Sequence, residues 1–455
     1  MYPWNFRTIS RSDPEYESAR RAAVWNGRVP DRYPELIAFP ETDEDVQNLV
    51  RYAKEKKLSI GTKSGGHSWT ASFLRDSGIL VNLEKMNDIS VNVKDCTATV
   101  QPAAYGSDLN VVLHQHDLMF PGGHCSTVGL GGYLLQGGFG WNSRKWGVAC
   151  ESVLAIDVVT ANGTLIHANA TDNKEYYWAA RGSGCGYFGL ITRFYVKVYS
   201  LPRGIMTSRY VFEVKDLDQA IAAMDAASNQ VSPDLELVLF IGRDQDGIEG
   251  RPTFAIVGDA LSETDAEALT ALSLLHDLPI MKKAVKSRPF VSCTLPEVLK
   301  RYDNILDNRG LRYETNNMWT DVPTTQLLPN IHEIIKSLPP APSHLYIVWW
   351  LPTRGRPDMA FSMEGRLFMS LYAISNDPSM DERNARFVVS SFQKLDNCRK
   401  GIQLADENLP GHPGKFMQTS NYRRLEALRR KHDPEGRFWG YMRVPPEFDE
   451  ALHVL

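Results

Sequence analysis

The glycine-rich stretch GGHCSTVGLGGYLLQGGFG, residues 122–140, carries the strongest structural signal in the chain. Glycine recurs so often here that the backbone, rather than side chains, must face a ligand or another segment. The glycines do not follow the GxGxxG order after a strand, and no distal acidic residue completes a Rossmann pattern. A Rossmann site is therefore disfavoured, and glycine-rich packing without any ligand stays open as an alternative.

A second glycine turn lies upstream, in TKSGGHSW, residues 62–69, directly after a predicted strand. Gly65 and Gly66 let backbone N–H groups approach an anion without interference from a Cβ atom. Ser64 and Ser68 add hydroxyl donors beside them. The arrangement suits a pyrophosphate, although a turn that binds nothing has the same composition.

Hydrophobic periodicity around these loops predicts alternating helices and strands. Residues 41–57 place apolar side chains on one helical stripe, with Thr42 as the N-cap. A further helix is expected near residues 107–116, and strands are expected at 79–83, 97–101, 153–160 and 191–199. Asn162-Gly163 supplies the hairpin turn after the third of these strands.

The run Ser200-Leu-Pro-Arg-Gly interrupts this alternation, as a domain boundary would. Beyond it, strands and helices alternate in a pattern that predicts an α+β unit on an antiparallel sheet. The predicted strands are 235–241, 254–258, 344–350 and 367–372, and the helices are 217–228, 263–275 and 381–395. An amphipathic helix over residues 421–431 turns Leu425 and Leu428 inward.

The composition excludes several classes of protein. With 455 residues and 43% hydrophobic content, the chain can bury a large core. Its 54 acidic and 50 basic residues leave a net charge of −4 without long runs, so nucleic acid is not an expected partner. We expect a soluble protein without a membrane span or secretory signal, with an intracellular location favoured. Sequons at Asn162 and Asn169 leave secretion open, and nothing indicates the oligomeric state.

The six cysteines show no CxxC pair and no regular spacing, so neither a zinc site nor a disulfide framework is expected. His124, with His114 and His116, lacks the acidic or thiolate partners that a metal site needs. Mostly reduced cysteines and no bound metal are therefore the prediction.

Together, the two glycine loops resemble the FAD-binding domain of the vanillyl-alcohol oxidase and para-cresol methylhydroxylase (PCMH) superfamily. Within it, they are most similar to the berberine bridge enzyme-like family. Further matching segments make the resemblance cover most of the chain. These segments are residues 141–148, 157–163, 178–184, 188–192, 421–425 and 431–434.

The resemblance implies an α+β fold with two domains. A PCMH-type FAD-binding domain would take residues 1–205, and an α+β substrate-binding domain on an antiparallel sheet would take residues 206–406. A C-terminal segment, residues 407–455, would return to the FAD domain. The active site would lie at the junction of the two domains.

The resemblance also implies that FAD is held by two covalent bonds. His67 would attach to the flavin 8α-methyl group and Cys125 to flavin C6, and imidazole and thiolate are suitable nucleophiles. From the residues alone, a loop histidine and a small buried cysteine remain the alternatives. Other expected cofactor contacts are Ser64, Gly65, Gly66, Ser68, Ser126, Val128, Gly129, Gly132, Gly137, Asn142, Gly147, Val148, Ile191 and Asn421.

Two of the residues near the flavin deserve separate mention. Val128 matches a family position that governs access of oxygen to the reduced flavin, where valine goes with oxidases and bulkier leucine or isoleucine with dehydrogenases; core packing is the alternative. Tyr133 stands where many relatives carry histidine. Its phenol could still donate a hydrogen bond near the flavin, but the balance of charge on the reduced flavin is left in doubt.

Asp406 is the expected catalytic base, because residues 401–407 align loosely with a family strand that ends in a base. A carboxylate beside the apolar flavin face would have a raised pKa, as a base working near neutrality needs. A solvated loop acid is the alternative. Tyr372 and Tyr133 complete the catalytic prediction, with Trp349 and Gln403 as further candidates that also suit core positions.

The implied reaction is oxidation of a small alcohol- or amine-type substrate by hydride transfer to flavin N5, with O2 reoxidising the flavin to give H2O2. A dehydrogenase of the same fold that uses another electron acceptor is one alternative. A non-catalytic flavoprotein is the other. The substrate itself is not predicted, because fold alone does not determine it.

Overall fold

Helix α2 (Asp43–Lys56) confirms the first local prediction, in a computed structural model that describes residues 4–453 except 245–246, 249 and 307–309. Its apolar stripe is buried, and Thr42 caps it by accepting a hydrogen bond from the Asp45 amide at 3.1 Å. The Asp45 carboxylate accepts in return from the Thr42 amide at 3.0 Å. Two backbone donors at the helix start are thereby satisfied.

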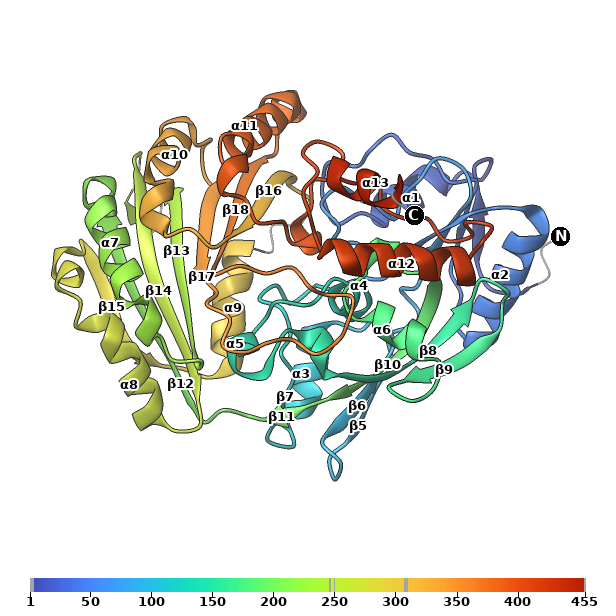
Figure 1. Ribbon diagram of the computed structural model, residues 1–455, viewed down its shortest axis with the longest axis horizontal. Helices are drawn as coiled ribbons and strands as arrows, with labels where there is room; N and C mark the ends of the chain where they lie inside the picture. Colours follow the sequence, from blue (N-terminus) through green and yellow to red (C-terminus); the bar gives the residue numbers. More distant parts are fainter. Residues whose placement is uncertain (1–3, 245–246, 249, 307–309, 454–455) are drawn as a thin grey trace.

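The first half of the chain builds two sheets, which lie on the right of Figure 1. In the smaller sheet, β4 pairs in parallel with both β2 and β3. Its order is β1 (Thr8–Ser10), β2 (Leu36–Ala38), β4 (Ile79–Asn82), β3 (Ile60–Lys63). The second sheet is antiparallel, with order β5 (Ile89–Asn92), β6 (Thr97–Val100), β10 (Gly189–Lys197), β8 (Val153–Thr160), β9 (Leu165–Asn169).

Short helices and a small ribbon complete this half. The predicted hairpin joins β8 to β9, with the Gly163 amide donating to the Thr160 carbonyl at 2.8 Å. The ribbon pairs β7 (Leu118–Met119) with β11 (Tyr199–Ser200). The helices are α1 (Tyr16–Ala22), α3 (Gly106–His114), α4 (Leu130–Leu135), α5 (Ser143–Trp146) and α6 (Lys174–Ala180).

The second half is an antiparallel sheet of seven strands with helices on its outer face (Figure 1), which confirms the predicted α+β fold class. The strand order is β15 (Lys286–Ser292), β12 (Gly204–Glu213), β14 (Pro252–Ser262), β13 (Leu235–Arg243), β17 (His344–Trp349), β18 (Leu367–Ser375), β16 (Arg312–Thr320). The helices on the outer face are α7 (Leu217–Ala227), α8 (Asp265–His276), α10 (Thr324–Ser337) and α11 (Asp381–Gln393). Helix α9 (Leu295–Leu306) lies on the inner side instead, where Leu295 and Val298 pack with Met119 and Trp141 of the first half.

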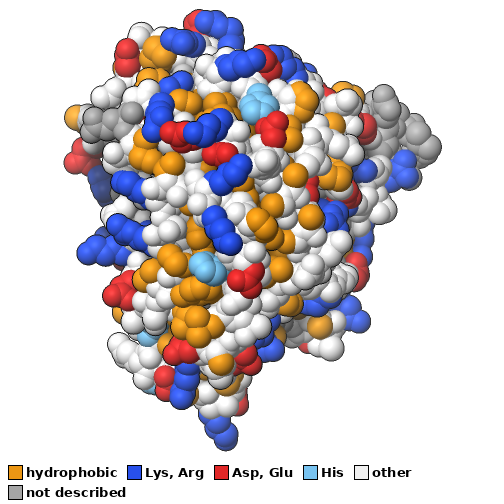
Figure 2. All heavy atoms as spheres, turned by 90° about the vertical axis from the view of Figure 1, so that its left-hand side faces the viewer, with side chains coloured by type: hydrophobic (Ala, Val, Ile, Leu, Met, Phe, Trp, Pro, Cys, Tyr) orange, Lys and Arg blue, Asp and Glu red, His pale blue; other side chains and the backbone are white. Residues whose placement is uncertain are grey.

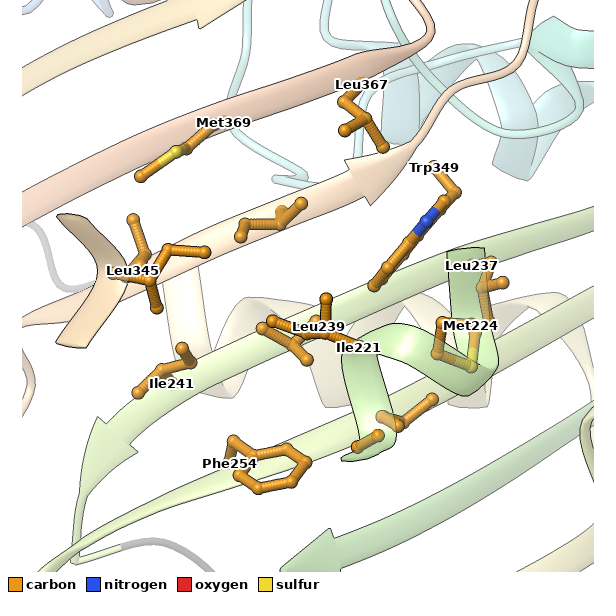
Figure 3. Close-up of a cluster of buried hydrophobic side chains, with 14 of the residues drawn as sticks. Ile221, Met224, Leu237, Leu239, Ile241, Phe254, Leu345, Trp349, Leu367 and Met369 are labelled. Atoms are coloured by element: carbon orange, nitrogen blue, oxygen red, sulfur yellow. The ribbon is translucent and has the colours of Figure 1, made fainter. Parts of the chain in front are cut away.

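Strand alternation divides the side chains of this sheet between two faces. Figure 3 shows the outer face, where Ile221 and Met224 of α7 pack on Leu237 and Leu239 of β13 in one buried cluster. The intervening β13 residues Val238 and Phe240 point to the opposite face, toward the first half of the chain. Over the helices, acidic and basic side chains are interspersed (Figure 2). No helix among the described residues is long and apolar enough to cross a bilayer.

The C-terminal helices α12 (Thr419–His432) and α13 (Pro446–His453) pack beside the first half rather than on the large sheet (Figure 1). Leu425 and Leu428 are buried in the same apolar cluster as strands β8 and β10, as the amphipathic pattern predicts. Ile402 and Leu404 also join this cluster, although the sequence interpretation placed them in the second domain. The chain therefore makes contact with its first half before residue 406.

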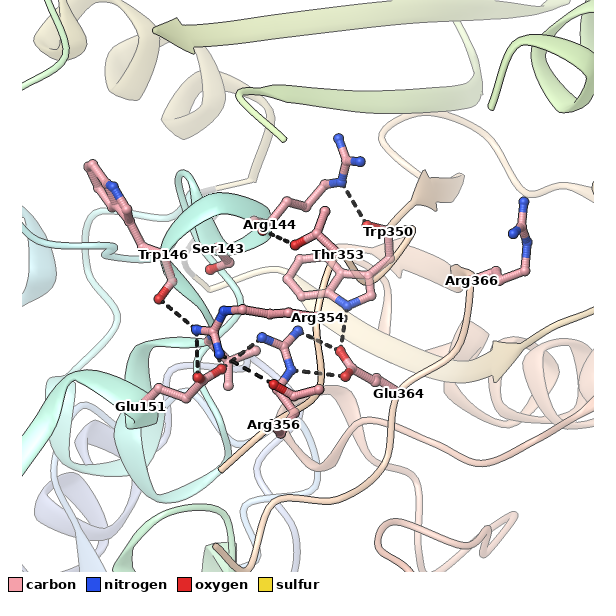
Figure 4. Close-up of polar contacts among 12 residues, drawn as sticks. Ser143, Arg144, Trp146, Glu151, Trp350, Thr353, Arg354, Arg356, Glu364 and Arg366 are labelled. Carbon is pink, nitrogen blue, oxygen red and sulfur yellow. Dashed lines mark hydrogen bonds and ion pairs between the residues drawn. The ribbon is translucent and has the colours of Figure 1, made fainter. Parts of the chain in front are cut away.

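An ionic cluster around the buried carboxylate of Glu151 connects the two halves (Figure 4). Glu151 of the first half pairs at 2.7 Å with both Arg354 and Arg356, and Arg356 pairs in turn with Glu364. Nearby, the guanidinium of Arg144 donates to carbonyl oxygens of the second half, at Trp350, Ser232 and Leu235. Burial lowers the Arg144 pKa to about 10, so the group stays charged.

Replacing Glu151 with alanine is expected to lower the free energy of unfolding by about 1.5 kcal/mol, because Arg356 loses one of its two carboxylate partners and the exposed Arg354 loses its own. Urea unfolding followed by circular dichroism measures the loss. Glu333→Ala is the matched control, since Glu333 and Lys336 form an exposed pair on α10. Equal effects of the two substitutions would contradict the assigned role of Glu151.

Candidate active site

A cavity of about 400 Å³ lies between the two glycine loops and the inner face of the large sheet. The loops meet through their backbones, since a Cβ atom on Gly65 would lie 2.5 Å from the Gly129 nitrogen. Glycine is required at this contact. Of the predicted site residues, those that line the cavity are Ser64, Gly65, Gly66, His67, Ser68, Cys125, Val128, Gly129, Gly132, Tyr133, Ile191, Tyr372, Gln403 and Asp406.

His67 and Cys125 converge on one hydroxyl group. Thr127 Oγ1 lies 3.0 Å from His67 Nε2 and 3.5 Å from Cys125 Sγ. The distance between His67 Nε2 and Cys125 Sγ therefore cannot exceed the sum of these two distances. Trp25 stacks on the His67 ring, with centroids 4.6 Å apart. Two nucleophilic side chains that are 58 residues apart in sequence are thus held at one spot on the cavity wall.

Asp406 receives a hydrogen bond on each carboxylate oxygen. Trp69 Nε1 donates to Oδ1 at 2.7 Å, and the Tyr372 hydroxyl donates to Oδ2 at 2.9 Å. Burial raises the Asp406 pKa, and the two donors oppose this rise without cancelling it. Burial, followed by the charge of Asp406, raises the Tyr372 pKa well above its usual value, so the phenol stays protonated. The solvated loop acid considered from the sequence is therefore not what the structure shows.

Asn317 of β16 holds the Asp406 turn in place. Its side-chain amide donates to the Gln403 and Asp406 carbonyl oxygens at 3.1 and 2.7 Å, and its own oxygen accepts from the Gln403 amide at 2.7 Å. Asn317 is fully buried. Sequence reasoning missed both Asn317 and Trp69, because their partners are distant in the chain.

The sheet side of the cavity is mainly aromatic and aliphatic. His344 stacks between Phe240 and Tyr372, with ring centroids 4.5 and 4.8 Å away. Burial lowers the His344 pKa to about 4, so its imidazole is neutral near pH 7. Val238 and Tyr346 continue this wall along β13 and β17. The arrangement brings an apolar surface up to the Asp406–Tyr372 pair.

Comparison with known proteins shows to which family the chain belongs. The chain matches the FAD binding domain family over residues 34–169. It is 31% identical over 449 residues to the FAD-linked oxidoreductase nodO of Hypoxylon pulicicidum, which covers 96% of this chain and 97% of that protein. The chain belongs to the FAD-linked oxidoreductases.

Solved structures share the fold of this chain. 6-Hydroxy-D-nicotine oxidase from Arthrobacter nicotinovorans superposes with a TM-score of 0.86 and 22% identity, covering 98% of this chain and 99% of that one. Berberine bridge enzyme-like 1 from Physcomitrella patens gives 0.82 and 21%, covering 97% of both chains. The predicted resemblance to this family, and the prediction of an oxidoreductase, are confirmed.

The loop after β3 has the donors that the FAD pyrophosphate needs. The backbone amides of Gly65, Gly66 and Ser68 have no acceptor among the described residues, and all three residues line the cavity. Gly66 has φ +81°, a conformation that favours glycine. Consecutive amide donors of this kind bind anions. The residues present therefore fit an FAD-linked oxidoreductase.

Six predicted cofactor contacts lie outside the cavity of this FAD-linked oxidoreductase: Ser126, Gly137, Asn142, Gly147, Val148 and Asn421. These residues serve in contacts between segments of the chain or in turns. The Asn142 side chain donates to the Leu261 carbonyl at 3.0 Å, and that of Asn421 to the Met359 carbonyl at 2.8 Å. Val148 is buried in an apolar cluster. Positive φ at Gly137 and Gly147 marks turns. Matching a motif located these residues in the chain but not in the cavity.

Tyr133 and Trp349 also differ from expectation. The Tyr133 hydroxyl donates to the Pro121 carbonyl at 2.7 Å, so its hydrogen goes to backbone rather than toward the cofactor. A Cβ atom at Gly140 would lie 2.3 Å from this hydroxyl, so that glycine makes room for the phenol. Trp349 packs on the helix-covered face of the sheet and donates to Asp225 at 3.2 Å. The Tyr133 hydroxyl is therefore engaged by backbone at the cavity wall, and Trp349 lies on the face of the sheet that points away from the cavity.

Proposed function

We propose that this FAD-linked oxidoreductase is an oxidase that holds FAD by two covalent bonds, to His67 and Cys125. The observation that carries the proposal is the approach of His67 Nε2 and Cys125 Sγ to the single hydroxyl of Thr127. Two nucleophiles this close could reach the 8α-methyl group and C6, which belong to the same ring of the flavin. The amides of Gly65, Gly66 and Ser68 would hold the pyrophosphate.

FAD bound by these residues would supply the redox chemistry, as the acceptor of a hydride from the substrate and the donor of two electrons to O2, which would give H2O2. The chain supplies the proton acceptor. Asp406 is placed to take the hydroxyl or amine proton of the substrate, either directly or through the Tyr372 hydroxyl, which donates to its Oδ2 at 2.9 Å. The aromatic wall around His344 would bind the substrate body and keep water away from this pair.

Val128 supports the choice of oxidase over dehydrogenase. It lines the cavity three residues beyond Cys125 and is only half-buried, so it borders space that O2 could occupy. If the protein is instead a dehydrogenase that passes electrons to another acceptor, Val128 serves only in packing. The hydrogen-bonded pair of Asp406 and Tyr372 on the cavity wall favours a catalytic protein over a non-catalytic flavoprotein.

Val128→Leu is expected to slow reoxidation by O2 about tenfold or more, because one extra methylene fills the space beside the flavin. Stopped-flow mixing of the reduced protein with O2 measures this rate.

Substrates for the reduction come from an anaerobic screen of alcohols, sugars and amines for flavin bleaching, and peroxide release in air is then assayed. Reduction without peroxide would favour the dehydrogenase, and no bleaching while sulfite still reacts would favour the non-catalytic flavoprotein.

A further inference from the structure

The residues on either side of Cys125 are held by acidic side chains from the second half of the chain. His124 Nε2 lies 2.8 Å from Glu236 Oε1 on β13, and both side chains are largely buried. The Ser126 amide donates to Asp303 Oδ1 on α9 at 2.9 Å. The Cys125 segment is thus tied to two elements of the other half.

Aromatic side chains support the contact between His124 and Glu236. Its ring packs against Trp141 at 4.3 Å and Tyr302 at 5.2 Å between centroids. The Tyr302 hydroxyl donates to Asp259 at 2.6 Å, and Asp259 lies directly opposite Glu236 in the sheet. Burial lowers the pKa of His124, but the Glu236 carboxylate and then Asp259 raise it by more, which favours a charged pair.

His67 is held differently. It stacks on Trp25 at 4.6 Å and contacts Thr127 at 3.0 Å, and both partners belong to the first half of the chain. The two attachment residues therefore differ in what positions them. His67 reaches the large sheet through Trp25, whose ring lies 5.2 Å from that of Tyr313 on β16. The Cys125 segment reaches the second half elsewhere, at Glu236 of β13 and Asp303 of α9.

We propose that Glu236 and Asp303 are positioning residues for the bond between Cys125 and the flavin, and that the His67 bond forms without them. The inference rests on the proposed double attachment. Docking of the second half would then precede closure of the sulfur bond. If the contact of Glu236 or that of Asp303 is lost, the Cys125 sulfur would sample positions from which it cannot reach the flavin ring carbon.

The bond-forming step balances with dioxygen as the oxidant. The Cys125 thiol and the flavin ring carbon each lose one hydrogen as the S–C bond forms. The two electrons and two protons released go to O2, which leaves as H2O2. Neither Glu236 nor Asp303 exchanges a proton in this step, so both act only through the position of the Cys125 segment.

Peptide mass mapping of the full-length protein tests this inference. Glu236→Gln and Asp303→Ala are expected to slow formation of the Cys125-linked peptide about tenfold or more, while the His67-linked fraction stays at the wild-type level. Asp303→Asn keeps an acceptor for the Ser126 amide and should retain both bonds. Glu333→Gln, on the exposed face of α10, is the control for charge removal.

The His67-linked fraction is the internal check on folding, because a misfolded variant would lose both bonds together. Unchanged Cys125 linkage in Glu236→Gln and Asp303→Ala would overturn the inference, and so would a parallel fall of the two fractions. A wild-type protein that lacks the Cys125 bond would instead overturn the proposed attachment, and this inference with it.

Discussion

Asp406→Asn is expected to lower kcat/KM about 10³-fold, because asparagine keeps the shape of the side chain but cannot accept a proton. Trp69 can still donate to the amide oxygen, and the Tyr372 hydroxyl can accept from the NH2 group that replaces Oδ2, so the surrounding structure should change little. Anaerobic reduction of the flavin by a substrate from the bleaching screen isolates the step. A fall of less than a few fold would contradict the assignment of Asp406 as the base.

The pH dependence provides an independent check on Asp406. A base must be ionised to work, and burial raises the Asp406 pKa, so the reduction rate should rise with pH through that raised pKa and then level off. Trp69→Phe removes a donor that stabilises the carboxylate, and it should therefore move this rise to higher pH. Asp406→Asn should abolish the rise of the reduction rate with pH. A shift to lower pH in Trp69→Phe would contradict the role given to the indole.

His67→Ala and Cys125→Ala are each expected to keep the flavin covalently attached through the remaining bond, while the double variant releases all of it on acid denaturation. The reason is that each side chain reaches Thr127 independently. Absorbance of the supernatant after precipitation measures the released flavin. Complete release from either single variant would show that the two bonds are not independent.

Cys185→Ala is the matched control for the cysteine. Cys185 also lines the cavity, but burial raises the pKa of its thiol to about 12, so it stays protonated and is a poor nucleophile. Its removal should leave both bonds intact. Loss of a bond in Cys185→Ala would mean that the wrong cysteine has been assigned.

Local sequence patterns were sufficient for much of the fold. Helix α2 was predicted because its stripe and its Thr42 cap are both local signals. Strand β16 was missed, since Asn316 and Asn317 give it a polar centre, and these side chains are buried only because residues 396–412 cover them. No local pattern can reveal a cover that comes from so far along the chain.

The candidate site divides in the same way. The glycine loops place their own residues, so His67 and the turn before it were found from sequence. The partnership of Trp69 with Asp406 joins residues 337 positions apart, and only the folded chain reveals it. Asn142 and Asn421 show the converse, because their motifs match the family while their side chains bind backbone carbonyls away from the cavity, which no motif indicates.

The intact mass of the denatured wild-type protein tests double attachment most directly. Each covalent bond to His67 or Cys125 removes one hydrogen from the protein and one from FAD. We predict a mass equal to that of the chain plus one FAD less four hydrogens, with flavin on both the His67 and Cys125 peptides after digestion. A mass equal to that of the chain alone, with all flavin released, would contradict the account.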